Sequence, residues 1–184
     1  HYTCGINPKM GGISKSILLL TQGLNIYGIK SSTVSLGNTK TNLKLWAKHF
    51  AFLKKYSLRV YLTLSPFENP YGIGWNFGLS KKTAVGILSS DVLILHQIYS
   101  LSTVIGYFHA QKFRKPYILF PHGSLSIYHE RDSRIIKKIA KIFIINRILR
   151  EANGFIVTSE LERSDLTDSM RNRSIVIQIG RAHV

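Results

Sequence analysis

The sequence is poor in acidic side chains and in cysteine. Nine Asp and Glu stand against 25 Lys and Arg, which gives a formal net charge of +16, and Glu68 is the only acid before Asp91. A charge of this sign attracts polyanions such as nucleic acid, anionic lipid headgroups or phosphorylated small molecules. A solvated basic surface without such a partner explains the same excess. The single cysteine, Cys4, excludes an internal disulfide and a cysteine-based zinc site, and a reducing, cytosolic setting is the simplest interpretation.

Long hydrophobic runs are absent as well. No window approaches the roughly 18 uninterrupted apolar residues that a membrane span requires. The start of the chain, HYTCGINPKMGG, lacks the basic residues and apolar core of a signal peptide. Because the chain begins at His1, we expect a fragment, and a targeting segment upstream stays open. At 184 residues and 45% hydrophobic, the chain has enough material for one well-buried core.

Short apolar runs alternate with segments of helical period. The strand-like runs are residues 29–36, 58–64, 91–95, 116–120, 155–158 and 174–177, with a shorter one near 2–6. The helical segments are residues 13–27, 42–56, 79–88, 100–113, 131–150 and 160–167. Short runs rich in β-branched residues are typical of strands that are covered on both faces. The alternation therefore predicts an α/β domain with a mostly parallel sheet.

Polar residues follow three of the predicted strands. In open parallel sheets, ligands bind beyond the carboxyl ends of the strands, and there the sequence places His96, then His122, then Glu160. These three side chains could converge on one cleft if their strands are neighbours, although a histidine that only satisfies local backbone is the structural alternative. Ser159 and Glu162 have the spacing of a capping box at the start of the last of these helices.

The glycine pair Gly11-Gly12 follows the first predicted strand. Such a pair can bring backbone amides at a helix start close to a phosphate or a sugar. An ordinary tight turn has the same composition. No pattern predicts a metal site, because the histidines are dispersed and acids are scarce near them.

The segment RDSRIIKKIAKIFIINRILR, residues 131–150, combines a basic stripe with an Ile/Phe face. A basic amphipathic helix can rest on an anionic membrane surface. A helix that packs its apolar face on the sheet and solvates its lysines has the same pattern, and both can hold at once. The stripe is formed by Arg134, Lys137, Lys138 and Lys141.

Four motifs, in this order, resemble the N-terminal domain of retaining family 4 glycosyltransferases with the GT-B fold. They are GGIS, SSDVLILHQ, RKPYILFPHGSL and REANGFIVTSELERSDL, and the similarity runs from about Asn7 to Ile177. The resemblance implies a Rossmann-like, three-layer α/β/α domain over residues 1–177, which is one half of a GT-B fold. In that family the N-terminal domain mainly holds the acceptor, and a C-terminal domain, absent from this chain, holds the nucleotide-sugar.

The resemblance also implies roles for individual residues. Gly11 and Gly12 match the glycine loop that faces the donor phosphates and the acceptor. His122 matches the histidine that reaches the transferred sugar, hydrogen-bonds a hydroxyl and helps to stabilise charge as the glycosidic bond breaks. Gly123 would permit the turn that exposes this side chain. Family positions near the cleft are also matched by His96, Ser159 and Glu160.

The implied function is transfer of a sugar, with retained anomeric configuration, from a nucleotide-sugar to a lipid-linked or polysaccharide acceptor. We expect cell-surface polysaccharide biosynthesis by a cytoplasmic enzyme, peripheral at the inner face of the membrane. The nucleotide-sugar is a co-substrate, no other cofactor is expected, and nucleic acid is not an expected partner. Without the C-terminal domain and its two glutamates, this fragment should be inactive. Residues 178–184, QIGRAHV, match a translated sequencing adapter, so we expect the natural sequence to end near Ile177.

Two other interpretations stay open. A basic, non-catalytic α/β module could bind nucleic acid or another polyanion, because affinity for phosphate backbones follows from basic charge. No helix-turn-helix signature or RNP-like aromatic strand accompanies that charge. The other interpretation is an orphan domain without catalytic function.

Overall fold

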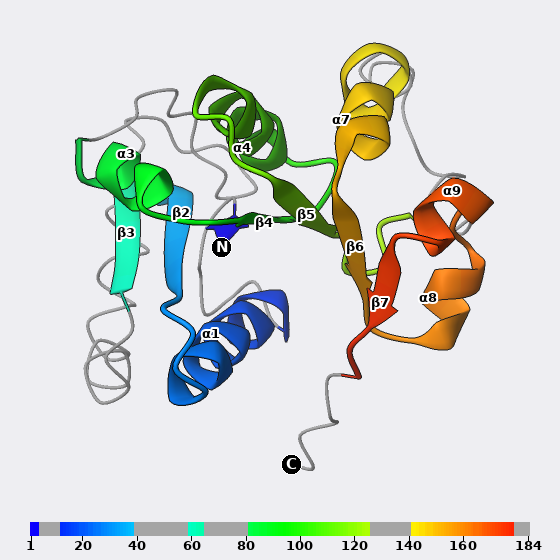
Figure 1. Cartoon of the computed structure of the whole chain (residues 1–184), viewed down its shortest axis with the longest axis horizontal. Coiled ribbons are helices and arrows are strands. Elements are labelled where there is room, and N and C mark those ends of the chain that lie inside the picture. The colour runs from blue at the N-terminus through cyan, green and yellow to red at the C-terminus, as the bar shows by residue number, and fades with distance from the viewer. Residues whose placement is uncertain (4–11, 39–58, 65–80, 126–140, 179–184) are drawn as a thin grey trace. The chain divides into compact units, whose positions relative to one another are not determined.

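The computed structural model describes residues 1–3, 12–38, 59–64, 81–125 and 141–178 (Figure 1). These residues belong to two compact units, His1–Ser90 and Asp91–Val184. Several predicted features lie outside the described residues: the helix 42–56, residues 4–6 of the first strand, residues 131–140 of the basic helix and the terminal residues 179–184.

The first unit contains three parallel strands in the order β3-β2-β1. They are β1 (Tyr2–Thr3), β2 (Ser32–Asn38) and β3 (Arg59–Leu64), accompanied by the helices α1 (Gly12–Ile26) and α3 (Lys81–Leu88). The helix α1 packs against β2, where the Thr21 and Thr33 hydroxyls lie 3.0 Å apart and Ile17 is buried. Helix α1 therefore contributes both apolar and polar contacts to this packing.

The turn between α1 and β2 is fixed by a glycine and an asparagine. Gly28 adopts φ +79°, the left-handed conformation that glycine tolerates best at the end of a helix. The Asn25 side chain donates to the carbonyl oxygen of Ser31 at 3.1 Å and accepts from its N–H at 2.8 Å. These bonds set the path of the chain into β2.

The second unit contains four parallel strands in the order β4-β5-β6-β7 (Figure 1). Helices lie between successive strands along the chain. The strands are β4 (Leu93–His96), β5 (Tyr117–Phe120), β6 (Gly154–Val157) and β7 (Ser174–Val176). The helices are α4 (Leu101–Lys112), the π-helical turn η2 (Lys141–Ile145), α7 (Asn146–Glu151), α8 (Glu160–Ser164) and α9 (Asp168–Arg171).

The strands of the second unit form the centre of its core. Leu95, Leu119 and Val157 have no exposed surface, and Phe120 and Phe155 are buried beside them. Burial of each such side chain stabilises the fold by about 1.5–3 kcal/mol relative to leaving it exposed. Because consecutive residues of β5 are buried, this strand is covered on both faces, as the sequence predicts.

The fold class is α/β and Rossmann-like, with parallel strands and helices between them, which confirms the prediction. The three-layer arrangement and the membership of a GT-B fold stay predictions. The predicted helix 160–167 is shorter in the structure. It ends at Ser164, and a separate helix, α9, begins at Asp168. The chain leaves helical geometry because Leu166 turns into the core and Thr167 is extended, with ψ 157°.

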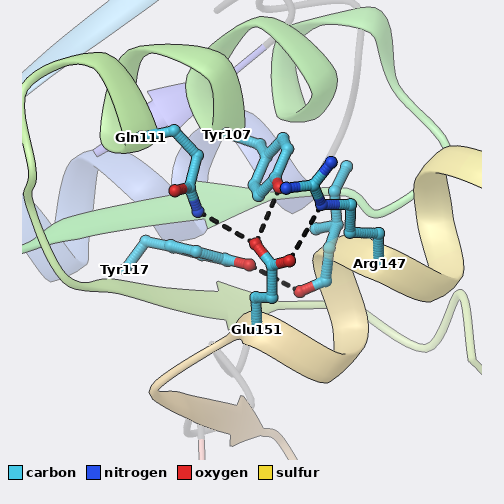
Figure 2. A network of polar contacts seen from close by, with 6 residues as sticks. Tyr107, Gln111, Tyr117, Arg147 and Glu151 are labelled. Atoms are coloured by element: carbon cyan, nitrogen blue, oxygen red, sulfur yellow. Dashed lines mark hydrogen bonds and ion pairs between the residues drawn. The ribbon is translucent and has the colours of Figure 1, made fainter.

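A polar network links α4 to α7 beside β5 (Figure 2). The Glu151 carboxylate accepts hydrogen bonds from the Tyr107 hydroxyl at 2.7 Å and from Nε of Arg147 at 2.8 Å. Gln111 donates to the same carboxylate at 3.1 Å, and the buried Tyr117 hydroxyl donates to the carbonyl oxygen of Ile148 at 2.7 Å. The bond from Tyr107, with the bond from Arg147, holds the pKa of Glu151 below its ordinary value.

Candidate active site

Two neighbouring strands of the second unit end at the candidate site. The strands β4 and β5 are parallel, and His96, the last residue of β4, lies in register with Phe120, the last residue of β5. Nδ1 of His96 lies 2.9 Å from Nε2 of His122, which is hydrogen-bond distance. The structure therefore brings together the two histidines that the sequence places after these strands.

The backbone after β5 is held in an unusual conformation. His122 has φ 55° and Gly123 has φ 76°, so two successive residues lie in the left-handed region. Glycine adopts this region without a steric penalty, but histidine does so at a cost of roughly 1–2 kcal/mol. Ser124 supports the turn through a hydroxyl bond of 2.7 Å to the carbonyl oxygen of Pro121. The left-handed backbone at Gly123 is the kind of turn that the sequence predicts this glycine to permit.

Aromatic stacking holds the His122 ring. Its centroid lies 4.0 Å from that of Phe120, with the two planes 8° apart, and 5.2 Å from that of His96. His96 is completely buried, whereas His122 is only partly buried. Within the part of the chain that the structure describes, no hydrogen bond reaches Nδ1 of His122. Nε2, which faces Nδ1 of His96, is the nitrogen of this ring that has a partner among these residues.

Both imidazoles are neutral at pH 7. Burial lowers the pKa of His122 to about 4, against a smaller opposite effect of the Glu162 charge. Burial also lowers the pKa of His96 well below its ordinary value, and His122 lowers it further. In a neutral pair one ring nitrogen donates and the other accepts, so the tautomer of His96 fixes whether Nδ1 of His122 donates or accepts.

The end of β4 is held by hydrogen bonds to its backbone groups. Gln97 is left-handed, with φ 65°, and its N–H donates to the carbonyl oxygen of Phe120 at 3.1 Å. The Thr103 hydroxyl on α4 donates to the carbonyl oxygen of His96 at 2.9 Å, and Ser100 caps α4 by accepting from the N–H of Thr103. These contacts hold His96 in place beside His122.

The carboxylate of Glu162, on α8 after β6, lies at the same turn. Ser159 caps α8 by accepting from the N–H of Glu162 at 3.1 Å, which is half of the expected capping box. The Glu162 side chain does not return to the cap residue but accepts from Gly123 and Thr158. The Glu160 side chain is 72% exposed and lies 3.6 Å from Arg163. Of the two acids, the structure brings Glu162 to the histidine turn and leaves Glu160 at the surface.

The other predicted site residues are the glycine pair and the basic stripe. Gly12 is the exposed first residue of α1, and Gly11 lies outside the described residues. Of the basic stripe, Arg134, Lys137 and Lys138 also lie outside them, as does the side chain of Lys141, the first residue of η2.

No helix in the described part of the chain is long and apolar enough to cross a lipid bilayer. Among the same residues, no group of three or more His, Cys, Asp and Glu side chains could hold a metal ion. Among the described residues, the cluster at the ends of β4, β5 and β6 consists of two histidines, a carboxylate and backbone amides.

Comparisons of the sequence with known proteins do not assign the chain to a family. No protein-family model matches the chain, and no curated protein matches it.

Proposed function

We propose that this chain is the acceptor-side domain of a retaining glycosyltransferase of family 4 with the GT-B fold. The observation that carries the proposal is the placement of His122. It follows β5 in left-handed backbone and is hydrogen-bonded to His96 through Nε2, which on this proposal leaves Nδ1 to bind the sugar. The order of the four motifs GGIS, SSDVLILHQ, RKPYILFPHGSL and REANGFIVTSELERSDL supports the same assignment.

His122 would contact the transferred sugar. In the reaction the bond between the anomeric carbon and the donor phosphate oxygen breaks. A bond to the acceptor hydroxyl oxygen forms on the same face, the acceptor proton passes to the departing phosphate oxygen, and a nucleoside diphosphate is released. A neutral imidazole can hydrogen-bond a sugar hydroxyl without the cost of burying a charge. Because Phe120 and His96 fix the ring, the hydrogen bond is formed without reorganisation of the side chain.

The proposed acceptor is lipid-linked or polysaccharide, and the proposed location is the cytoplasmic face of a membrane. A basic chain with a net charge of +16 would be attracted to anionic headgroups and to pyrophosphate-linked acceptors. On this proposal the donor base and sugar are recognised chiefly by the C-terminal domain.

The test uses the complete protein encoded by the source reading frame. It is incubated with a panel of UDP-, GDP- and ADP-sugars and with membranes that carry lipid-linked acceptors. We expect a product whose new glycosidic bond keeps the anomeric configuration of the donor, as determined by NMR. An inverted configuration, or no transfer from any donor to any acceptor while the protein is folded, would remove the proposal.

The excess of basic residues also supports a second candidate, a module that binds nucleic acid. This candidate predicts a mobility shift that weakens steeply with salt but persists at physiological ionic strength. Loss of the shift at that ionic strength would discard it.

A further inference from the structure

The carboxylate of Glu162 joins two strand ends. Its side chain is buried, at 6% exposed, on α8 after β6. One oxygen, Oε1, accepts from the N–H of Gly123 at 2.7 Å. The other, Oε2, accepts from both the N–H and the hydroxyl of Thr158 at 2.8 Å. A single side chain therefore holds the turn after β5 and the turn after β6.

These contacts require a carboxylate. Three donors point at the two oxygens, and an ionised carboxylate is the side chain that accepts at both. A glutamine has one accepting oxygen and one donating NH₂ group, so it would present a donor to either Gly123 or Thr158. Hydrogen bonds to an ionised acceptor are about twice as strong as neutral ones, and burial makes an unpaired donor costly.

The bond to Gly123 acts directly on His122. The N–H of Gly123 belongs to the peptide group that links it to His122, so its orientation depends on ψ of His122 and φ of Gly123. Both residues are left-handed, at φ 55° and 76°. This conformation is unfavourable for His122, and a short charge-assisted bond to the following peptide offsets the cost.

We propose that Glu162 is the positioning residue for His122, because its buried carboxylate anchors the left-handed turn that presents the imidazole. Glu162 does not touch the ligand itself on this proposal but acts through the Gly123 peptide. The effect on sugar transfer rests on the proposed function, whereas the anchoring of the turn can be measured without any enzymatic activity.

The main test is Glu162→Gln in this chain, followed by amide hydrogen exchange and histidine-ring NMR. We expect the Gly123 amide to exchange at least about tenfold faster and the His122 ring signals to shift, while the core amides of Leu119 and Val157 stay protected. The matched control is Glu160→Gln, the same chemical change at an exposed position of the same helix. It should change neither signal. A folded Glu162→Gln protein with a protected Gly123 amide and unchanged His122 signals would overturn the proposal.

A second measurement does not depend on the variant folding. In the unaltered chain, the Gly123 and Thr158 amides should each show an NMR coupling through the hydrogen bond to the side-chain carboxyl carbon of Glu162, because both donate to one carboxylate. A coupling to the Thr158 amide without one to the Gly123 amide would overturn the proposal.

In the complete enzyme, Glu162→Gln should lower kcat by about 10- to 100-fold with a smaller change in KM, since a displacement of about 1 Å can cost that much. Glu162→Asp keeps the charge on a shorter side chain and should recover part of the loss. If the complete protein transfers no sugar, the proposed function fails while the exchange result still decides the role of Glu162. If kcat is unchanged although the Gly123 amide exchanges faster, the turn does not contribute to sugar transfer, and the proposed effect of Glu162 on kcat is wrong.

Discussion

The chemistry of the candidate site depends on a pair of histidines that cannot easily become charged. His96 is completely buried at the end of β4, and its partner His122 stacks on Phe120. Burial disfavours the imidazolium form, and a second positive charge 2.9 Å away would add repulsion. The pair can therefore donate and accept hydrogen bonds at neutral pH without changing its charge.

The pair should make folding stability depend on pH. The pKa of His122 falls from 6.5 to about 4 on folding, and the pKa of His96 is lowered as well. Between pH 6.5 and 5 the unfolded chain therefore binds more protons, and stability decreases as the pH falls. Each such proton contributes a slope of up to about 1.4 kcal/mol per pH unit. Urea unfolding at several pH values measures this slope. The His96→Asn variant lacks one of the two imidazoles, so its slope should be smaller by the contribution of that histidine. An unchanged slope in that variant would contradict the account.

Sequence reasoning predicts His96, His122 and Gly123 of this site, but it assigns the carboxylate to Glu160 and not to Glu162, and it does not predict the contacts that hold them. A histidine and a glycine directly after a strand indicate a turn at the ligand-binding edge of a parallel sheet. Glu162 has the spacing of a helix cap, which is a local signal. Its bond to Gly123 joins residues 39 positions apart, and no local pattern predicts it. The neighbouring Glu160 has the same chemistry, and only the direction of each side chain from α8 distinguishes them.

At the scale of elements, α4 and α7 are held together by Glu151. The Tyr107 hydroxyl comes from α4, and Arg147 lies on α7 with Glu151 itself (Figure 2). The Arg147 side chain is 60% exposed and that of Glu151 is 29% exposed. Tyr107 is almost fully buried. Because exposed ion pairs contribute little, the bond from Tyr107 should matter more than the pair with Arg147.

We predict that Glu151→Ala lowers the free energy of unfolding by about 1–2 kcal/mol, because the Tyr107 hydroxyl loses its charged acceptor. A double-mutant cycle with Tyr107→Phe should give a coupling energy of about 1 kcal/mol. Glu160→Ala, which removes an exposed carboxylate, should stay within about 0.5 kcal/mol of the unaltered chain. A coupling energy near zero would show that the two helices are held by apolar packing alone.

The elements themselves were largely predictable, because each alternation of apolar run and helical period gives a local signal. The strands β5 and β7 begin and end within a residue of their predicted positions. The separation of α8 from α9 was not predictable, since no glycine or proline marks it. It depends on the burial of Leu166, which is decided by packing and not by local propensity.

At the scale of the whole molecule, the excess of positive charge is the feature that the fold leaves unexplained. The net charge is +16, and a parallel α/β fold does not require it. The membrane hypothesis assigns part of this charge to the stripe in residues 131–150, most of which lies outside the described part of the chain.

We predict that the chain floats with vesicles that contain phosphatidylserine and not with neutral phosphatidylcholine vesicles. Lys137→Gln combined with Lys138→Gln should weaken this binding by about 30-fold, since each lysine near an anionic surface contributes about 1 kcal/mol. The control is Lys15→Gln with Lys30→Gln, which removes the same charge from exposed positions of the first unit. Equal binding to neutral and anionic vesicles would remove the membrane hypothesis.

The most direct test of the account is the turnover of His122→Ala in the complete enzyme. The account predicts a loss of about 100-fold or more in kcat, because a fixed hydrogen-bond partner of the transferred sugar is removed. The control is His109→Ala, in the last turn of α4 at the opposite end of that helix from His96, and it should retain turnover within about twofold. Unchanged turnover in a folded His122→Ala enzyme would contradict the central claim that this imidazole acts on the transferred sugar.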